Sequence, residues 1–227
     1  MVTQAELGAL LSEQLKYWFY DDFRSADHMT GAATQTGAVT LRQFSALLET
    51  GLQQGSTARM NTAANTWNPR YGTLDVKLRL DAEENVFMFA GFKKSLDAPA
   101  ETMTESHAGL LFYGGTLYFS TGNSDPLNPT QQKTTISDTD MTRWLLFRIN
   151  FNRFKWYSLP YTVPYFDTQA LPGLQQGMTR KWSAETVNGS TLPEDTVHYL
   201  VFYIANTVGA NRTLELQHLN YGEVYPD

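Results

Sequence analysis

The sequence predicts an all-β protein built as a two-layer sandwich, and three observations indicate this fold class. Aromatic residues make up 13% of the 227 residues and charged residues only 18%, a balance that favours sheet over long charged helices. Several segments alternate apolar and polar residues with a period of two, which is typical of half-buried strands. Turn residues separate these segments, and no helical pattern lies between them. Such a series indicates a sandwich or barrel.

Charge and composition exclude several classes of function. The chain has 17 basic and 23 acidic residues, a net charge of −6 and no cysteine. It therefore lacks the basic surface of a nucleic-acid binder and any attraction to anionic membranes, so we expect neither as a partner. Disulfides and cysteine-ligated metals are excluded. No apolar run reaches the about 18 residues of a membrane span, and we expect no signal peptide because Glu6 and Glu13 interrupt the first segment.

The N-terminal segment predicts a short helix over about residues 4–16. Thr3 and Glu6 fit a capping box, in which each side chain bonds the backbone of the other residue. Apolar residues follow at helical spacing, at Leu7, Leu10, Leu11, Leu15 and Trp18. Such a stripe packs on its own domain or docks on another subunit. We assign residues 1–20 to a helical arm for assembly and residues 21–227 to the sandwich.

The strands are expected to begin only after a polar, turn-rich stretch, residues 21–39. Residues 71–81 then alternate cleanly, with Leu74, Val76, Leu78 and Leu80 on one face. Residues 86–92 are apolar on both faces, which predicts a central strand covered by a layer on each side.

Three strand pairs are expected in the second half of the chain. The first turns at Gly114 and Gly115, where a two-glycine turn favours a hairpin. The second joins residues 143–152 to the following segment near Arg153. The third turns through residues 208–211.

The strand order from Trp67 to Tyr225 resembles the concanavalin A-like lectin/glucanase superfamily. The resemblance rests on "WNPRYGTLDVKLRLD", "NVFMFAGFK", "ESHAGLLFYGGTLYFSTG", "TTISDTDMTRWLLFRINFN" and "HYLVFYIAN". It implies a concanavalin A-like jelly-roll β-sandwich with a short N-terminal helix. Versions with a helical arm and a Thr/Asn-rich, cysteine-free sandwich look like those on bacterial and archaeal virus particles. There the resemblance implies a capsid decoration or fibre-type role.

The glycanase signature of this superfamily is absent from the sequence. Retaining glycanases need two carboxylates about 5–5.5 Å apart, which a Glu-x-Asp-x-(x)-Glu strand supplies. The nearest acidic cluster, residues 81–85, reads as a turn. Alginate-lyase-like members use Gln-x-His with an arginine and a tyrosine, whereas this chain has Glu105 and His107 without those partners. We interpret Glu105 and His107 as a polar pair at a strand start, and we expect no enzyme.

No metal site is predicted. Many superfamily members hold a structural Ca²⁺, which takes six to eight oxygen ligands. Six residues could contribute, but none has a dedicated ligand spacing: Asp21, Asp22, Asn123, Asp125, Asp138 and Asp140. His28, His198 and His218 have no spacing suited to zinc. We therefore expect no cofactor, and bound Ca²⁺ is left open.

The densest aromatic cluster outside the alternating strands is the candidate binding site. It comprises Trp156, Tyr157, Tyr161, Tyr165 and Phe166, with Trp182 beside them. Pro160 and Pro164 bar a regular central strand here. Aromatic rings on such a segment pack in the core, stack on sugar rings or fill a subunit interface.

The sequence favours a non-enzymatic virion surface protein, either a capsid decoration or a fibre-type subunit. The expected partners are capsid or other virion proteins, further copies of the chain and host glycans. One alternative is a carbohydrate-binding lectin module of cellular origin, which would be extracellular. A weaker alternative is a polysaccharide lyase or glycanase with a divergent site.

Overall fold

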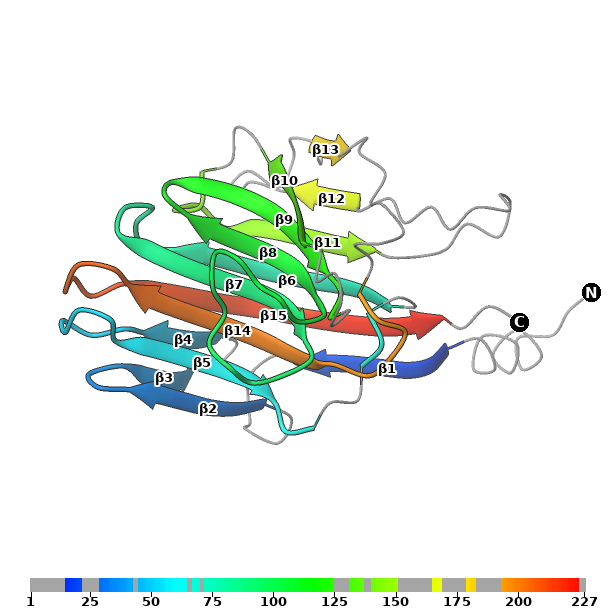
Figure 1. Ribbon diagram of the computed structural model, residues 1–227, viewed down its shortest axis with the longest axis horizontal. Helices are drawn as coiled ribbons and strands as arrows, with labels where there is room; N and C mark the ends of the chain where they lie inside the picture. The colour runs from blue at the N-terminus through cyan, green and yellow to red at the C-terminus, as the bar shows by residue number, and fades with distance from the viewer. Residues whose placement is uncertain are drawn as a thin grey trace, which may run out of the picture.

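The computed structural model describes residues 15–21, 29–42, 45–64, 67–69, 72–124, 131–136, 140–150, 165–168, 179–182 and 193–224. Within these ranges the regular elements are all strands, and two large antiparallel sheets stack on each other (Figure 1). The predicted all-β sandwich is therefore confirmed. No helix in this part of the chain could cross a membrane.

The six-stranded sheet lies at the back in Figure 1. Its strands are, in spatial order, β11 (Leu145–Asn150), β6 (Gly72–Leu80), β15 (Thr213–Val224), β4 (Ser45–Glu49) and β3 (Ala38–Arg42), with β1 (Leu15–Asp21) also paired to β15.

The seven-stranded sheet lies in front of it. Its strands are, in spatial order, β10 (Gln131–Ile136), β9 (Thr116–Gly122), β8 (His107–Tyr113), β7 (Val86–Lys93), β14 (Tyr199–Asn206), β5 (Thr57–Thr62) and β2 (Met29–Thr34). A separate two-stranded sheet pairs β12 (Tyr165–Thr168) with β13 (Thr179–Trp182).

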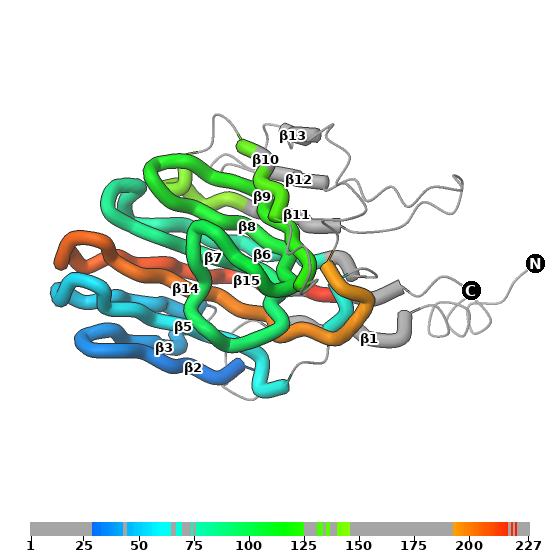
Figure 2. Tube along the Cα trace, viewed as in Figure 1, coloured from blue at the N-terminus to red at the C-terminus, as the bar shows by residue number. Residues whose placement is uncertain are grey.

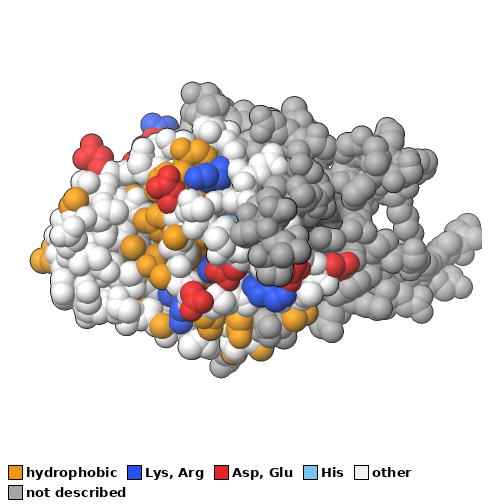
Figure 3. Space-filling view, viewed as in Figure 1, with side chains coloured by type: hydrophobic (Ala, Val, Ile, Leu, Met, Phe, Trp, Pro, Cys, Tyr) orange, Lys and Arg blue, Asp and Glu red, His pale blue; other side chains and the backbone are white. Residues whose placement is uncertain are grey.

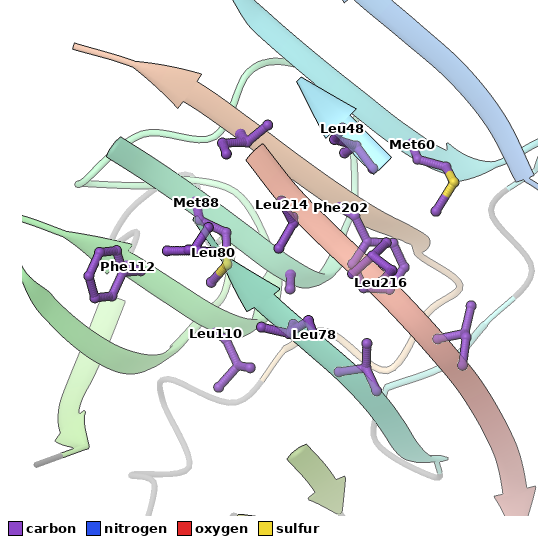
Figure 4. Packing of buried hydrophobic residues seen from close by; sticks show 14 of the residues in the cluster. Leu48, Met60, Leu78, Leu80, Met88, Leu110, Phe112, Phe202, Leu214 and Leu216 are labelled. Carbon is purple, nitrogen blue, oxygen red and sulfur yellow. The ribbon is translucent and has the colours of Figure 1, made fainter. Parts of the chain in front are cut away.

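The core lies between the two large sheets and follows from strand alternation. Leu74, Val76, Leu78 and Leu80 are fully buried, as their period predicts. They face apolar residues of the other sheet, among them Met88, Leu110, Phe112 and Phe202 (Figure 4). This cluster fixes which face of each strand points inward, because side chains alternate between the two faces.

β7 is covered on both sides, as its apolar sequence predicts. Met88 and Phe92 point into the main core. Phe89, on the opposite face, is also fully buried, in a second apolar cluster. The outer face of the seven-stranded sheet therefore carries a layer of its own.

Of the three predicted strand pairs, one matches the structure, one differs from it, and the partner segment of the other lies outside the described residues. The hairpin at Gly114 and Gly115 joins β8 to β9 as predicted. β14 and β15 do not pair, because the turn at residues 208–211 passes the chain from one sheet to the other. β11 pairs with β6, and residues 151–164 lie outside the described residues. Turn residues predict that a chain reverses, but they do not select its hydrogen-bonding partner.

The N-terminal third contains strands that the sequence did not predict. β2 and β3 occupy part of the stretch interpreted as turns, and β2 is exposed apart from its first residue. Its small residues give no apolar alternation because it forms a sheet edge. Leu15 and Trp18, expected on a helical stripe, lie instead in β1, where backbone pairing with β15 sets the structure. Leu7, Leu10 and Leu11 lie outside the described residues.

Candidate functional site

The outer face of the seven-stranded sheet carries side chains of distinct chemistry in rows set by the strand register. One row crosses three strands through Tyr199, Lys93 and His107. Another row lies four residues away along β14, β7 and β8. It runs from β5 to β9 through Arg59, Tyr203, Phe89, Leu111 and Tyr118. The first row is polar and the second is largely aromatic.

Two glycines face each other between these rows. Gly91 on β7 is the register partner of Gly109 on β8. A Cβ atom on Gly91 would lie 2.4 Å from the carbonyl oxygen of Ala108, and one on Gly109 would lie 2.5 Å from that of Ala90. Both distances are far below van der Waals contact, so this close approach of two strands requires glycine at both positions.

A loop crosses this outer face. Residues 94–106, which we call the strap, link β7 to β8 and fold across the front of the sheet (Figure 2). Its Leu96 and Met103 belong to the second apolar cluster, with Phe89, Leu111, Val201 and Tyr203. The strap is tied at both sides of the sheet: the Arg59 guanidinium on β5 donates to the carbonyl of Leu96, and the amide of Met103 donates to Gln131 Oε1 on β10 at 3.2 Å.

A buried polar cluster lies at the end of the strap. Lys93 has no exposed surface and forms an ion pair with Glu105. The second oxygen of the same carboxylate accepts the amide of Ser95 at 3.0 Å. Ser120 Oγ lies 2.8 Å from His107 Nε2 and accepts a hydrogen bond from Gln131 Nε2 at 2.9 Å. The cluster therefore joins the strap to β7, β8 and β9.

The ring of His107 is neutral. Its Nδ1 lies 2.7 Å from the carbonyl oxygen of Glu105, so Nδ1 must carry the proton and Nε2 accepts from Ser120. Burial, followed by the charges of Lys93 and His198, lowers the pKa of His107 to about 3. The Glu105 group that holds the imidazole is thus its backbone carbonyl, whereas its carboxylate pairs with Lys93.

His198, immediately before β14, repeats this arrangement. Its Nδ1 lies 2.7 Å from the carbonyl oxygen of Thr196, two residues earlier, and its Nε2 lies 2.8 Å from Ser106 Oγ. Ser106 and His198 are both fully buried. Each histidine thus fixes the start of a strand to a serine: His107 of β8 to Ser120 of β9, and His198 before β14 to Ser106 of the strap. This is a structural use of the imidazole.

An aromatic band remains accessible beside the strap. We give this name to Phe87, Tyr113, Tyr118 and Tyr203, which come from four adjacent strands. The rings of Tyr113 and Tyr118 stack with centroids 5.0 Å apart, and Phe87 lies 6.4 Å from Tyr113 and 6.1 Å from Tyr203. Phe87, Tyr113 and Tyr118 are half-buried, and Tyr203 is nearly covered. Figure 3 shows hydrophobic side chains gathered along the middle of this face.

Charged groups lie at one end of the aromatic band. The Lys133 ammonium is 5.3 Å from the ring centroid of Tyr113 and 5.9 Å from that of Tyr118, and it donates to the Tyr113 hydroxyl at 2.9 Å. Glu101, on the strap, lies 4.0 Å from the same ammonium. Burial, followed by hydrogen bonds to Glu101 and Tyr118, raises the pKa of Tyr113, so its hydroxyl stays protonated. This end combines flat apolar rings with donors and acceptors.

The predicted binding segment is only partly described. Trp156, Tyr157 and Tyr161 lie outside the described residues. Tyr165 and Phe166 lie in β12, and Trp182 lies in β13, where the register pairs Trp182 with Tyr165. Trp182 therefore shares a two-stranded sheet with Tyr165 and Phe166. A role of these residues in binding stays a prediction.

The candidate metal ligands do not gather in the part of the chain that is described. No group of three or more His, Asp or Glu side chains there could hold a metal ion. Asp140 accepts both the amide and the hydroxyl of Thr142 and pairs with Arg143. The hydrogen bond from the Thr142 hydroxyl lowers the pKa of Asp140, so this carboxylate caps a turn. Asp22, Asp125 and Asp138 lie outside the described residues.

The fold is similar to solved glycan-binding and glycan-cleaving proteins. A legume lectin-like domain from Entamoeba histolytica matches with a TM-score of 0.55 and 14% identity, over 87% of this chain and 91% of that one. A non-specific endo-β-1,3(4)-glucanase of family GH16 matches at 0.56 and 11%, over 91% and 90%. A Bacteroides ovatus GH16 enzyme bound to a mixed-linkage glucan product matches at 0.56 and 9%, over 89% and 99%. No protein-family model and no curated protein sequence matches the chain.

These similarities confirm the predicted concanavalin A-like jelly roll and correct the expectation of a non-enzyme. Several of the similar structures are endo-acting glycanases, so this fold is one that supports glycan hydrolysis. The missing glycanase signature excludes one arrangement of carboxylates and does not exclude activity. The virion role receives no support from these similarities and stays a prediction.

Proposed function

We propose that the protein is a carbohydrate-binding jelly-roll domain that holds a glycan on the aromatic band of the seven-stranded sheet. The observation that carries the proposal is the accessible row of Phe87, Tyr113 and Tyr118 across adjacent strands. Pyranose rings have apolar C–H faces that stack on flat aromatic rings, while polar groups at the border hold the hydroxyls.

The dimensions of the aromatic band suit a short oligosaccharide. Neighbouring strands lie about 4.8 Å apart, so rings on four strands extend over about 14 Å. The strap stands along one side of the band, and Glu101 and Lys133 supply an acceptor and a donor at one end. A glycan lying across the strands would therefore meet rings beneath it and polar groups beside it.

The fold neighbours define the glycans to be tested. They include enzymes named for β-1,3(4)-glucan, mixed-linkage glucan and mucin O-glycans. We would titrate the protein with each of these three classes by calorimetry. The same mixtures would be assayed for new reducing ends, because hydrolysis on this fold would appear there.

Tyr118→Ala is the decisive variant. Loss of one stacking ring should weaken binding by about 1–3 kcal/mol, or about 5-fold to 150-fold. The matched control is Val208→Ala, which removes an exposed hydrophobic side chain from a turn remote from the band in sequence. Binding that Tyr118→Ala leaves unchanged, with the variant folded, contradicts the proposed site. Failure of the wild-type protein to bind any of the three classes contradicts the proposed function.

The sequence also predicts a more specific role, that of a virion surface protein. This role is compatible with a glycan-binding domain. Its support is the apolar residues Leu7, Leu10 and Leu11 that precede β1, and the resemblance of the sequence to domains on virus particles. A capsid decoration or fibre-type subunit would bind particle proteins or further copies of itself as well as glycans. Truncation of residues 1–14, which leaves β1 intact, should then reduce self-association in light scattering.

A further inference from the structure

The outer face of the six-stranded sheet holds a second cluster built around an aromatic ring. Trp144 immediately precedes β11, and the register of Leu145 with Leu78 continues to place it opposite Arg79. Arg79 is in turn the register partner of Glu215 on β15. The three side chains therefore form a row on the face turned away from the core.

Two cationic side chains, Lys77 and Arg79, lie over the indole ring of Trp144. The Arg79 guanidinium carbon lies 4.6 Å from the ring centroid, and Lys77 Nζ lies 5.1 Å from it. Lys77 and Arg79 are two residues apart on β6, so both extend from the same outer face. Both cations therefore lie over the indole ring, and Trp144 is half-buried, so part of its side chain stays exposed. Burial lowers the pKa of Lys77, consistent with a covering ring.

A polar pocket of about 270 Å³ lies beside Arg79, the residue whose guanidinium contacts the Trp144 ring. It is lined by Arg79, Leu80, Asp81, Thr142, Thr213 and Glu215. Arg79 is fixed by two hydrogen bonds to one oxygen of Glu215, from Nε at 2.9 Å and Nη2 at 2.7 Å. Asp81 accepts the amide of Thr213 at 2.8 Å. Carboxylates have about four acceptor positions each, so both retain capacity for ligand hydroxyls.

From this geometry we infer that Trp144 and the adjoining pocket form a second saccharide-binding site, and that the domain is bivalent for glycans. A flat ring beside an arginine, two carboxylates and two threonine hydroxyls matches a polyhydroxylated pyranose better than an apolar ligand. The pocket volume suits one sugar residue at the end or edge of a chain. The ligand class in this inference rests on the proposed glycan-binding function. The residues of the second site are different from those of the aromatic band.

Bivalence follows from the position of the two sites. The aromatic band and Trp144 lie on the outer faces of different sheets, with the whole core between them. One short oligosaccharide cannot contact both, so each domain would hold two glycan chains. A monomer with two such sites cross-links a polysaccharide, whereas a monomer with one site only coats it.

The test combines stoichiometry with cross-linking. Mixed-linkage β-glucan, β-1,3-glucan and mucin are each mixed with the protein at a concentration at which light scattering shows a monomer, and turbidity is followed. Short oligosaccharides of the polymer that reacts are then counted per protein chain by calorimetry. We expect two bound oligosaccharides and a turbid mixture for the wild-type protein. Trp144→Ala and Tyr118→Ala should each bind one oligosaccharide and give at least a tenfold loss of turbidity.

An independent measurement covers the case in which Trp144→Ala fails to fold. The indole N–H resonance of Trp144, assigned through Trp144→Phe, should shift and saturate when the wild-type protein is titrated with the same oligosaccharide. A silent indole resonance, or two bound oligosaccharides in a folded Trp144→Ala variant, overturns the second site alone, since the aromatic band still binds. Absence of any glycan binding by the wild-type protein overturns the proposed function and this inference with it.

Discussion

Ser120 donates a hydrogen bond to His107 over 2.8 Å, and this bond keeps the buried imidazole neutral. The ring already donates its only proton, from Nδ1 to the carbonyl of Glu105. A second proton on Nε2 would face the Ser120 hydroxyl inside a fully buried site, close to Lys93. The pair therefore acts as a structural latch between β8 and β9.

Acid should weaken the protein through His107. The pKa of this residue is about 3 in the folded protein and about 6.5 in an unfolded chain. Between these values the unfolded chain binds a proton that the folded protein excludes. The free energy of unfolding therefore falls as the pH falls from 6.5, by up to about 1.4 kcal/mol per pH unit. Urea unfolding of His107→Gln at pH 5, 6 and 7 should show a shallower slope than the wild-type protein. Parallel slopes would show that His107 does not carry this effect.

Removing only one partner of the ion pair between Lys93 and Glu105 should strongly lower the free energy of unfolding. Glu105→Gln leaves a fully buried ammonium group without its carboxylate, and such changes cost about 3–5 kcal/mol. Burial already lowers the pKa of Lys93 to about 8, which shows how poorly this site tolerates the charge. Lys93→Met in the Glu105→Gln background should restore much of the stability. Chemical denaturation of the three proteins measures this, and a double variant weaker than Glu105→Gln would contradict the account.

Gly91 and Gly109 should tolerate no side chain. Alanine at either position places Cβ within about 2.5 Å of a backbone carbonyl oxygen, and backbone cannot move aside as a flexible side chain can. We expect Gly91→Ala to lose about 3 kcal/mol or more, at the upper end of overpacking effects. Gly31→Ala is the matched control, because its Cβ would meet only the Val39 side chain, at 3.0 Å. Equal melting temperatures for the two variants would count against the close-approach explanation.

The sequence predicts the layers of this fold better than their connections. The period-two pattern of Leu74 and Leu78 identifies an inner face because burial of one strand face follows from alternation alone. The apolar Phe87 and Phe89 likewise predict an outer layer. The strap that supplies it has no periodic pattern: only Leu96 and Met103 are large and apolar within it, and covering a sheet is a tertiary contact.

The aromatic band was missed because its residues lie in ordinary strands. Tyr113 and Tyr118 belong to the predicted hairpin, and the turn at Gly114 and Gly115 puts both on one face through the register pairs Tyr113–Thr116 and Leu111–Tyr118. That register was available from the sequence. What it could not give is which face points to solvent, since this depends on how the second sheet and the strap pack against β8 and β9.

The aromatic band and the segment around Trp156 make opposite predictions as glycan sites. If the aromatic band binds the glycan, Tyr118→Ala should weaken binding by about 1–3 kcal/mol while Trp156→Ala leaves it unchanged. If the segment around Trp156 and Tyr161 forms the site, Trp156→Ala should weaken binding by the same amount while Tyr118→Ala leaves it unchanged. Each must first melt like the wild-type protein, because a core aromatic residue replaced by alanine costs about 3–5 kcal/mol of stability and would lower affinity indirectly. Calorimetric titration with mixed-linkage β-glucan oligosaccharides decides between them. Weakening of binding by both variants would show that the two regions contribute to one extended site.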